Sequence, residues 1–587
     1  MSSSTDTEDK PSYRRFTENP NAKYESQELE GYCPVPMTML HTDGSILYEN
    51  AHFDLLYEII VQNDTDALQR YLSIAPWAVS TEPVVANHLW AVPDTCLFSD
   101  DCGCDIANDM NCCIWAVGCG ALDVLQILLN HCMKGKDPNM KIRFKSGECL
   151  LLNEAAQNGD VEIVRFLLDN QPRYASIHER DPCDYTALLS AASAYFIGLS
   201  TSSQEGQPGP TESELVMNLL LDRGASASDV SHANSDTVLT LAAQWAGSQL
   251  IKRLIDEGAD IYTKVERGSF IDKFWNLHHC AFEVNALYVA CTHANFEAVK
   301  TIIDCRGAGV DILDVLWQRD SRGSFPLHWV TQSDLPKESF GYSNAAVLDK
   351  ARSIANIIEL LLGLDPTMIN VTDNDGNTPL HYATRSPSRY DTMYTPIIQL
   401  LCARGGDASI RNAEGQTPLH TLFRLEGDGD YRENYREKNP VDTATVITLL
   451  THGATPADID KAGNTPLHIT ATNLEWADVM SLLLVHGADP ALPNLNGQTA
   501  LHRAAGGTYL GCNNKYKAPE RIRAQEDVLS RLIKAGGVEL MDLKDAEEMK
   551  AEEICHKTRQ AWKEIDDCLK HTGNGSGRER VPRMYKI

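Results

Sequence analysis

Six cysteines between Cys96 and Cys119 form the densest set of reactive side chains in the sequence. They are Cys96, Cys102, Cys104, Cys112, Cys113 and Cys119, six thiols within 24 residues. Four thiolates could hold a structural zinc ion, but such sites commonly take ligands from pairs two to four residues apart, which Cys-x-Cys and Cys-Cys do not supply. Residues 112–119 also fit a helix in which cysteine packs as a small apolar residue. Packed thiols are favoured, and a metal-binding or enzymatic site here is the alternative.

A second group of nucleophilic and metal-ligating side chains is His278, His279 and Cys280, with Cys291 and His293 nearby. A catalytic Cys–His pair needs an orienting group, and the sequence offers no acid in that role. The motifs of phosphate-binding loops, dinucleotide folds, zinc proteases and serine hydrolases do not occur. We therefore expect a binding protein rather than an enzyme, with no catalytic residue, metal or cofactor.

One short phrase recurs along the second half of the chain. Its copies are Phe325-Pro-Leu-His328, Thr378-Pro379-Leu-His381, Thr417-Pro418-Leu-His420, Thr465-Pro466-Leu-His468 and Thr499-Ala-Leu-His502. A Thr hydroxyl can accept a hydrogen bond from a free amide of the first helical turn, and Pro is tolerated where its missing N–H is not needed. The phrase therefore predicts the start of a helix in each copy.

A second phrase ends in Gly and contains apolar residues seven, four and three positions before it. The triplets are Met217, Leu220, Leu221; Ile251, Leu254, Ile255; Ile398, Leu401, Cys402; Val446, Leu449, Leu450; Met480, Leu483, Leu484; and Leu529, Leu532, Ile533. This spacing places three apolar side chains on one helical face, and Gly suits the left-handed residue that closes a helix. Each repeating unit is predicted to be turn, helix, loop, helix.

The two phrases resemble the pattern of the ankyrin-repeat family, as in 373–383 and 485–489. His468 and His502 are 34 residues apart, close to the family period of about 33. The resemblance implies an all-α ankyrin-repeat solenoid of about eleven helix pairs that share one continuous apolar core. It also implies a structural role for His328, His381, His420, His468 and His502, since the family uses this histidine to tie adjacent turns through backbone groups.

The sequence predicts six segments. They are an acidic, disordered leader (1–49), degenerate repeats with the Cys-rich insertion (50–146), central degenerate repeats (147–320), well-formed repeats with loop insertions (321–538), a charged helical cap (539–570) and a disordered basic tail (571–587).

Five units carry extra residues between their two helices, at about 197–213, 333–345, 385–395, 425–441 and 506–523. Equivalent positions in a stack line up, so these insertions should form one rim. They hold seven of the 20 tyrosines, where about three would be expected by chance, namely Tyr342, Tyr390, Tyr394, Tyr431, Tyr435, Tyr509 and Tyr516. Tyrosine favours interfaces. The tyrosines could equally anchor the insertions onto the helices, and the two interpretations carry equal weight.

The net charge of −29 indicates the kind of partner. Such a surplus disfavours broad capture of nucleic acid or of an anionic membrane surface and favours a basic protein. Because no long apolar run or signal-peptide pattern is present, we expect a cytoplasmic or nuclear protein. Some ankyrin-repeat proteins bind transcription factors, so the resemblance suggests an adaptor or transcription co-regulator; partner identity and oligomeric state are not predicted.

Overall fold

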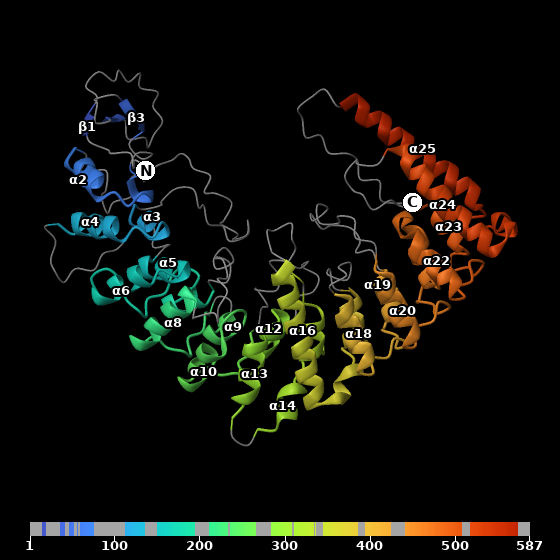
Figure 1. The fold of residues 1–587 in the computed structure, drawn as a ribbon, viewed down its shortest axis with the longest axis horizontal. Helices are drawn as coiled ribbons and strands as arrows, with labels where there is room; N and C mark the ends of the chain where they lie inside the picture. Colours follow the sequence, from blue (N-terminus) through green and yellow to red (C-terminus); the bar gives the residue numbers. More distant parts are fainter. Residues whose placement is uncertain are drawn as a thin grey trace, which may run out of the picture. The chain divides into compact units, whose positions relative to one another are not determined.

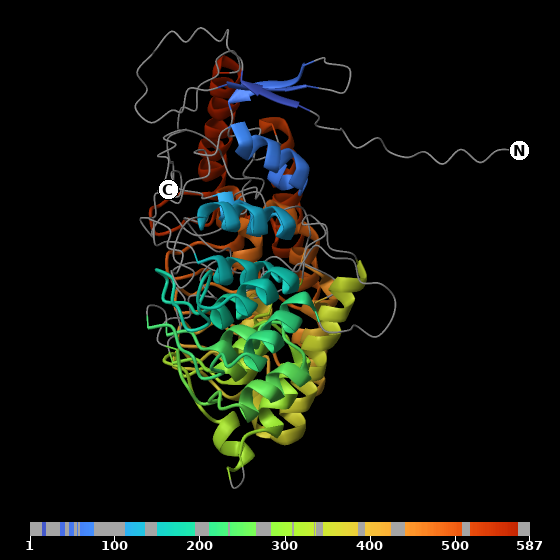
Figure 2. The same cartoon turned by 90° about the vertical axis from the view of Figure 1, so that its left-hand side faces the viewer.

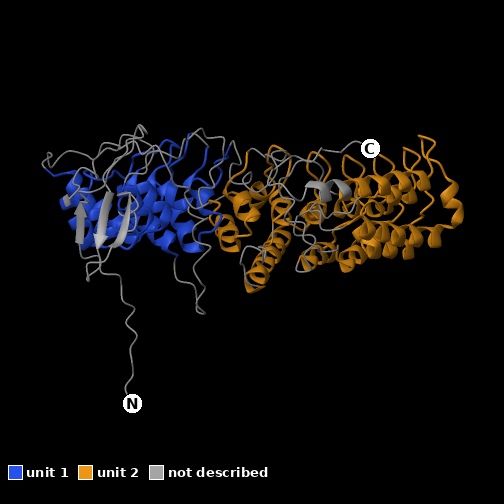
Figure 3. Ribbon diagram, turned by 90° about the horizontal axis from the view of Figure 1, so that it is seen from above, with its two compact units in different colours: residues 1–266 blue, residues 267–587 orange. Residues whose placement is uncertain are grey.

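The computed structural model describes residues 56, 59–74, 112–134, 150–193, 211–232, 235–265, 283–307, 310–333, 335, 344–385, 394–423, 441–507 and 517–566, and the backbone alone of 15–18, 36–40, 46–51 and 567–572. The chain divides into two compact units, Met1–Glu266 and Arg267–Ile587 (Figure 3). The boundary falls inside the segment 147–320 that the sequence analysis treats as one.

Unit 1 contains a small sheet followed by helix pairs (Figure 1). Its elements are β1 (Arg15–Glu18), β2 (Pro36–Leu40), β3 (Ile46–Ala51), α2 (Thr65–Ile74), α3 (Cys112–Gly118), α4 (Leu122–Cys132), α5 (Leu151–Asn158), α6 (Val161–Asp169), α7 (Ala187–Ala192), α8 (Glu212–Asp222), α9 (Val238–Ala242) and α10 (Ser248–Asp256).

Unit 2 continues the alternation of first and second helices. Its elements are α12 (Ala286–Thr292), α13 (Phe296–Asp304), α14 (Ile312–Leu316), α15 (Pro326–Thr331), α16 (Asn344–Leu364), η5 (Pro366–Asn370), α17 (Pro379–Arg385), α18 (Thr395–Ala403), α19 (Pro418–Leu422), α20 (Thr443–Thr451), α21 (Pro466–Thr472), η8 (Leu474–Trp476), α22 (Ala477–Val485), α23 (Ala500–Ala505), α24 (Ala518–Gly536), η9 (Val538–Asp542) and α25 (Ala551–Thr572).

Within each unit, first helices pack on first helices and second helices on second helices. In unit 1, α5 contacts α7 and α6 contacts α8, and Figure 2 shows these helices in successive layers. In unit 2, α17 contacts α19 and α18 contacts α20. Ten pairs have both helices bounded in the described part of the chain, and α2 is preceded by helical residues 56 and 59–61. The predicted all-α fold of about eleven helix pairs is confirmed.

The apolar triplets of the second helices supply the core. Val446 and Leu449 of α20 are fully buried, and Leu450 is half-buried. In α24, Leu532 is fully buried and Leu529 is half-buried, because this helix also packs against α25 and buries Gln525 and Val528 as well.

Residues 15–18, 36–40 and 46–51 form a three-stranded antiparallel sheet in the order β1-β2-β3, where the sequence analysis expects a disordered leader. Thr38 of β2 lies opposite Thr17 of β1 and Glu49 of β3. Residues 36–40 alternate methionine with a polar residue at Met37, Thr38 and Met39, which is the two-residue period of a strand. The polar composition of the first thirty residues led to the prediction of disorder, and the short alternating pattern was overlooked.

The segment 539–570 consists of a turn and a helix. The carboxylate of Asp545 accepts hydrogen bonds from the backbone N–H groups of Glu547 and Met549, both at 2.9 Å. Helix α25 then packs against α23 and α24, while its outward side shows charged residues such as Glu552, Glu553 and Lys557. The last complete pair is therefore covered by a helix with a polar outer face.

Replacing Gln525 by alanine is expected to detach α25 from α24. The buried Gln525 amide donates to the carbonyl of Ala505 at 2.7 Å and accepts from Nε of Arg559 at 2.7 Å. Losing it leaves both partners unsatisfied, at a cost of about 2 kcal/mol. Hydrogen exchange in α25 would show the loss as faster exchange. The exposed Gln560, which bonds only Glu564 on its own helix, is the matched control, and equal effects of the two alanine variants would contradict the prediction.

Candidate interaction surface

The turns between pairs in unit 2 form a hydrogen-bonded edge. Inside one turn, Oδ1 of Asp373 accepts from the backbone N–H groups of Asp375 and Asn377 at 2.9 and 2.7 Å. Backbone bonds then join each turn to the next. These bonds run from Asn374 N to Arg322 O, Ala413 N to Asp375 O, Lys461 N to Glu414 O, Leu495 N to Ala462 O and Ala546 N to Asn496 O, at 2.6–3.0 Å.

Glycine is required where these turns come closest. Gly463 has φ +75°, and a Cβ placed on it would lie 2.8 Å from the backbone nitrogen of Leu495 in the next turn. Any side chain would therefore strain the backbone and separate the two turns.

The histidines of the repeated phrase tie each first helix to the following turn. Nδ1 of His381 accepts from the backbone N–H of Thr378 at 3.1 Å and lies 2.9 Å from its hydroxyl, while Nε2 lies 3.0 Å from the carbonyl oxygen of Gln416. The same contact to the next turn joins His328 to Asn377, His420 to Asn464 and His468 to Gln498, at 3.0–3.2 Å. These bonds are the ones that the family resemblance implies.

Both ring nitrogens are committed, which fixes the charge of these histidines. A carbonyl oxygen only accepts, so Nε2 carries the proton and Nδ1 is the acceptor. A second proton on Nδ1 would face the Thr378 N–H. Burial lowers the pKa of His328 and of His381 to about 4, and it also lowers the pKa of His420 and His468. The rings are neutral at physiological pH and serve as structural supports.

The row of histidine contacts ends at His502. Its Nδ1 lies 2.9 Å from the Thr499 hydroxyl, but its buried Nε2 has no hydrogen-bond partner among the described residues. Like its counterparts, Thr499 begins its helix at the predicted residue. The inter-turn tie is therefore made by four of the five phrase histidines.

The described cysteines of the dense cluster are mostly packed. Cys112 and Cys113 are buried in α3 beside Cys132 of α4, whereas Cys119 is exposed. Burial raises the pKa of Cys112 to about 12, and a hydrogen bond with Cys132 together with burial raises that of Cys113. These buried thiols are protonated and inert. Cys96, Cys102 and Cys104 lie outside the described residues, and the metal-site alternative there stays a prediction.

The second chemical cluster is described only in part, because His278, His279 and Cys280 lie outside the described residues. Cys291 is buried in α12, and burial raises its pKa. In the described part of the chain, no group of three or more His, Cys, Asp or Glu side chains is arranged to hold a metal ion.

Tyr394 is the single rim tyrosine within the described ranges. It is fully buried, and its hydroxyl donates to the carbonyl of Thr331. At this position the side chain anchors the start of α18 on α15 and is not available to a partner, which is the anchoring alternative. Tyr342, Tyr390, Tyr431, Tyr435, Tyr509 and Tyr516, and most of the five insertions, lie outside the described residues.

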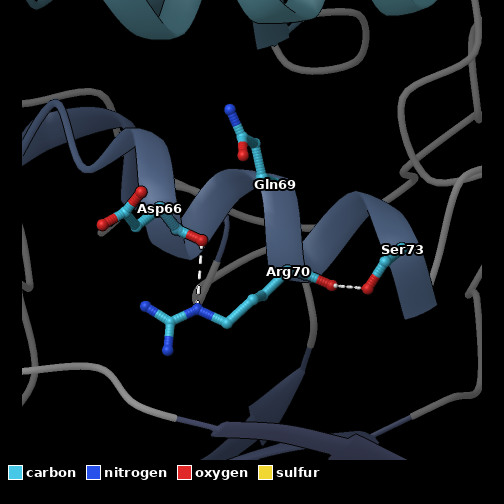
Figure 4. A pocket seen from close by; sticks show the side chains of 4 residues that line it. All are labelled: Asp66, Gln69, Arg70 and Ser73. Carbon is cyan, nitrogen blue, oxygen red and sulfur yellow. Dashed lines mark hydrogen bonds between the residues drawn. The ribbon is translucent and has the colours of Figure 1, made fainter.

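A shallow depression on α2 is lined by Asp66, Gln69, Arg70 and Ser73 (Figure 4). The Nε of Arg70 donates to the backbone oxygen of Asp66 at 3.1 Å, and the Ser73 hydroxyl donates to the backbone oxygen of Arg70 at 2.6 Å. All four side chains come from one helix, and the two hydrogen bonds stay within it. The depression therefore offers no convergent chemistry.

Sequence reasoning missed a buried aromatic–carboxylate network in unit 2. Oδ2 of Asp320 accepts from Nε1 of Trp329 at 2.9 Å, and Oδ2 of Asp373 accepts from the Tyr382 hydroxyl at 2.8 Å. Both carboxylates open a turn nine residues before the aromatic residue that they bind, and that spacing was the available signal. These bonds hold the hydrogen-bonded row of turns in unit 2, which we call the turn edge, onto the first helices.

Stacked helix pairs joined by a bonded edge of turns define a repeat solenoid. Residues 438–513 match the family model for ankyrin repeats in three copies, and residues 375–413 match that for the single ankyrin repeat. The chain is therefore an ankyrin-repeat protein. The predicted family is confirmed, and ankyrin repeats are in general surfaces for binding other proteins.

Curated relatives match parts of the chain. It is 35% identical over 118 residues to the poly [ADP-ribose] polymerase tankyrase of Caenorhabditis elegans, covering 19% of this chain and 5% of that protein. It is 26% identical over 362 residues to the human transient receptor potential cation channel subfamily A member 1, covering 60% and 25%. The chain thus spans a quarter or less of these two relatives.

A solved structure, the human ASB11 ankyrin repeat domain, matches with 16% identity and a TM-score of 0.32, covering 51% of this chain and 96% of that chain. Among the described helices, none has both the length and the apolar character required to cross a membrane.

Proposed function

We propose that this chain is a regulatory adaptor that binds a basic protein through the turn edge of unit 2, and that a transcription factor is such a partner. The observation that carries the proposal is the exposure of carboxylates on turns whose backbones are fixed to one another. Asp375, Glu414 and Glu547 occupy equivalent exposed positions on three turns. Together with the net charge of −29, they favour a Lys- and Arg-rich partner surface.

The rigidity of the edge supports this role. Backbone bonds between turns hold neighbouring tips in register, so binding does not have to order them. The carboxylates themselves are largely uncommitted to the fold. The Asp375 side chain is 64% exposed, and its ion pair with Arg322 is long, at 3.6 Å.

Reversing charge on the edge is the test of this proposal. The full chain carrying Asp375→Lys and Glu414→Lys is expected to capture its partner from native extract at least about tenfold less well than the unmodified chain. Raised salt should weaken capture by the unmodified chain, because exposed charges are screened. Mass spectrometry of captured proteins gives the readout.

The matched control is Asp256→Lys with Asp304→Lys, which changes the net charge equally on exposed second-helix positions. If control and edge variants lose the same proteins to the same extent, the edge is not the binding surface. Salt-independent capture would likewise contradict a charge-based interaction.

The rim tyrosines add a second contact to this proposal. Tyr431→Ala with Tyr435→Ala is expected to weaken capture without lowering the melting temperature. A large fall in melting temperature would instead assign these two side chains the anchoring role that Tyr394 has.

A further inference from the structure

Three consecutive second helices of unit 2 are almost free of charge. Helices α18 and α20 contain no charged residue, and α22 contains one, Asp478. Helices α10 and α13 have the same length of nine residues and contain three charged residues each. Charged residues make up 23% of the whole chain, so their scarcity is a property of these three helices and not of the chain.

The three helices are neighbours, and exposed apolar side chains lie on their outward sides beside the uncharged polar residues Gln399, Thr443 and Thr451. Contacts join α18 to α20 and α20 to α22, and Figure 1 shows them in succession along unit 2. Ile447 of α20 is 42% exposed and Val485 of α22 is 82% exposed. Half-buried leucines fill the surface around them, namely Leu400, Leu450, Leu482 and Leu484. We call the outward side of α18, α20 and α22 the uncharged face.

Three hydroxyls on the uncharged face are satisfied by their own helices. The hydroxyls of Thr448 and Thr451 donate to the carbonyls of Ala444 and Ile447 at 2.8 and 3.0 Å. The hydroxyl of Ser481 donates to its own helix in the same way, at 2.8 Å. Covering this face would therefore leave none of these three donors unpaired, which removes the usual cost of burying hydroxyls.

Charges at the two borders of the uncharged face are also paired. Arg404, at the end of α18, forms an ion pair with Glu359 of α16. Asp478, at the start of α22, lies 3.1 Å from Nη1 of Arg531 on α24. Two of the charges that border the uncharged face are thus neutralised.

We propose that the uncharged face binds the same face of a second copy of this chain. A partner bearing unpaired charge would lose hydration here and meet no counter-charge, so the occupant must be apolar. A second copy presents such a surface, and two-fold symmetry places the same helices opposite one another. Each copy carries a net charge of −29, so two copies repel one another where carboxylates face each other. The uncharged face is the surface through which they can make contact with less repulsion.

The size of the uncharged face predicts a weak dimer. Each helix is about 14 Å long and neighbouring axes are about 10 Å apart, so the three helices span roughly 400 Å² in projection. A standard interface buries about 800 Å² of accessible surface per partner. We therefore expect dissociation in the micromolar range.

Sedimentation of the full chain at concentrations up to about 100 μM tests the proposal. The mass should rise from 64.9 kDa towards twice that value as concentration increases. Ile447→Asp and Val485→Asp place like charges opposite one another, and each should weaken association at least about tenfold. Val485 is 82% exposed, so the melting temperature of Val485→Asp should stay unchanged, whereas Ile447 is only 42% exposed and Ile447→Asp should lower the melting temperature as well. Leu495→Asp, at a leucine that is 76% exposed on a turn, is the control and should dimerise as the unmodified chain does.

Salt separates this association from the adaptor function. Raised salt screens the repulsion between copies and should strengthen the dimer, whereas it should weaken capture of a basic partner. A monomer at every concentration and salt level would overturn the proposal and leave the adaptor function standing. Equal weakening by Leu495→Asp and Val485→Asp would overturn the assignment to this face.

Discussion

Acidification from about pH 6.5 to about pH 4 is expected to destabilise unit 2 by several kcal/mol, because its buried histidines take up protons only when the chain unfolds. The folded-state pKa of His328 and of His381 is about 4, below the ordinary value of about 6.5. Their contribution to stability is therefore complete above about pH 6.5 and is lost as pH falls towards the folded value. Each such histidine contributes a loss of about 1.4 kcal/mol per pH unit.

Urea unfolding followed by circular dichroism across this pH range gives the slope of the free energy of unfolding against pH. Replacing His381 by asparagine should reduce that slope by about 1.4 kcal/mol per pH unit, whatever it does to stability at neutral pH. His452→Asn, at an exposed histidine after α20, is the matched control. Identical slopes for the two variants would show that His381 is protonated in the folded protein.

Replacing Tyr394 by alanine is expected to lower the free energy of unfolding by about 4 kcal/mol, because a fully buried aromatic ring leaves a cavity. The change also removes the hydrogen bond to the backbone carbonyl of Thr331, the last residue of α15. Tyr394→Phe keeps the ring and should cost only about 1 kcal/mol. Urea titration gives the total, and hydrogen exchange should locate the loss in α15 and α18.

Tyr431→Ala is the matched substitution at a rim tyrosine to which we assign a binding role. It should leave the unfolding free energy within about 0.5 kcal/mol of the unmodified chain. A loss below about 1 kcal/mol for Tyr394→Ala would mean that the side chain is not held as described.

Most of the helices could be predicted because their starts and their buried faces are determined by residues close together in the sequence. Thr465-Pro466 begins α21 at the predicted residue, and Met480 and Leu483 of α22 are buried as their spacing indicates. Degenerate units such as α3 and α4 keep the apolar spacing without the Thr-Pro start, so their helices form while their sequence signal is weak. The sheet of β1, β2 and β3 was missed because its strands are short and lie in a polar segment.

The candidate surface was less predictable because the exposure of a side chain depends on how neighbouring helix pairs pack within unit 2. Composition placed Tyr394 with the other rim tyrosines, and only the contact with Thr331 shows that it is buried. The uncharged face depends on three helices becoming neighbours although 39 residues separate α18 from α20 and 25 separate α20 from α22. Apolar positions such as Ile447 and Val485 look like core in sequence and are accessible in the structure.

Two systems of contacts hold the described residues of unit 2 together. Backbone bonds pass from turn to turn, and packing passes from first helix to first helix and from second to second. A link between two helices that takes part in neither system can be lengthened at little cost, because doubling the length of a flexible link costs only about 0.6 kcal/mol. New recognition elements can therefore be grafted into these links, or exchanged among them, while the scaffold keeps its stability.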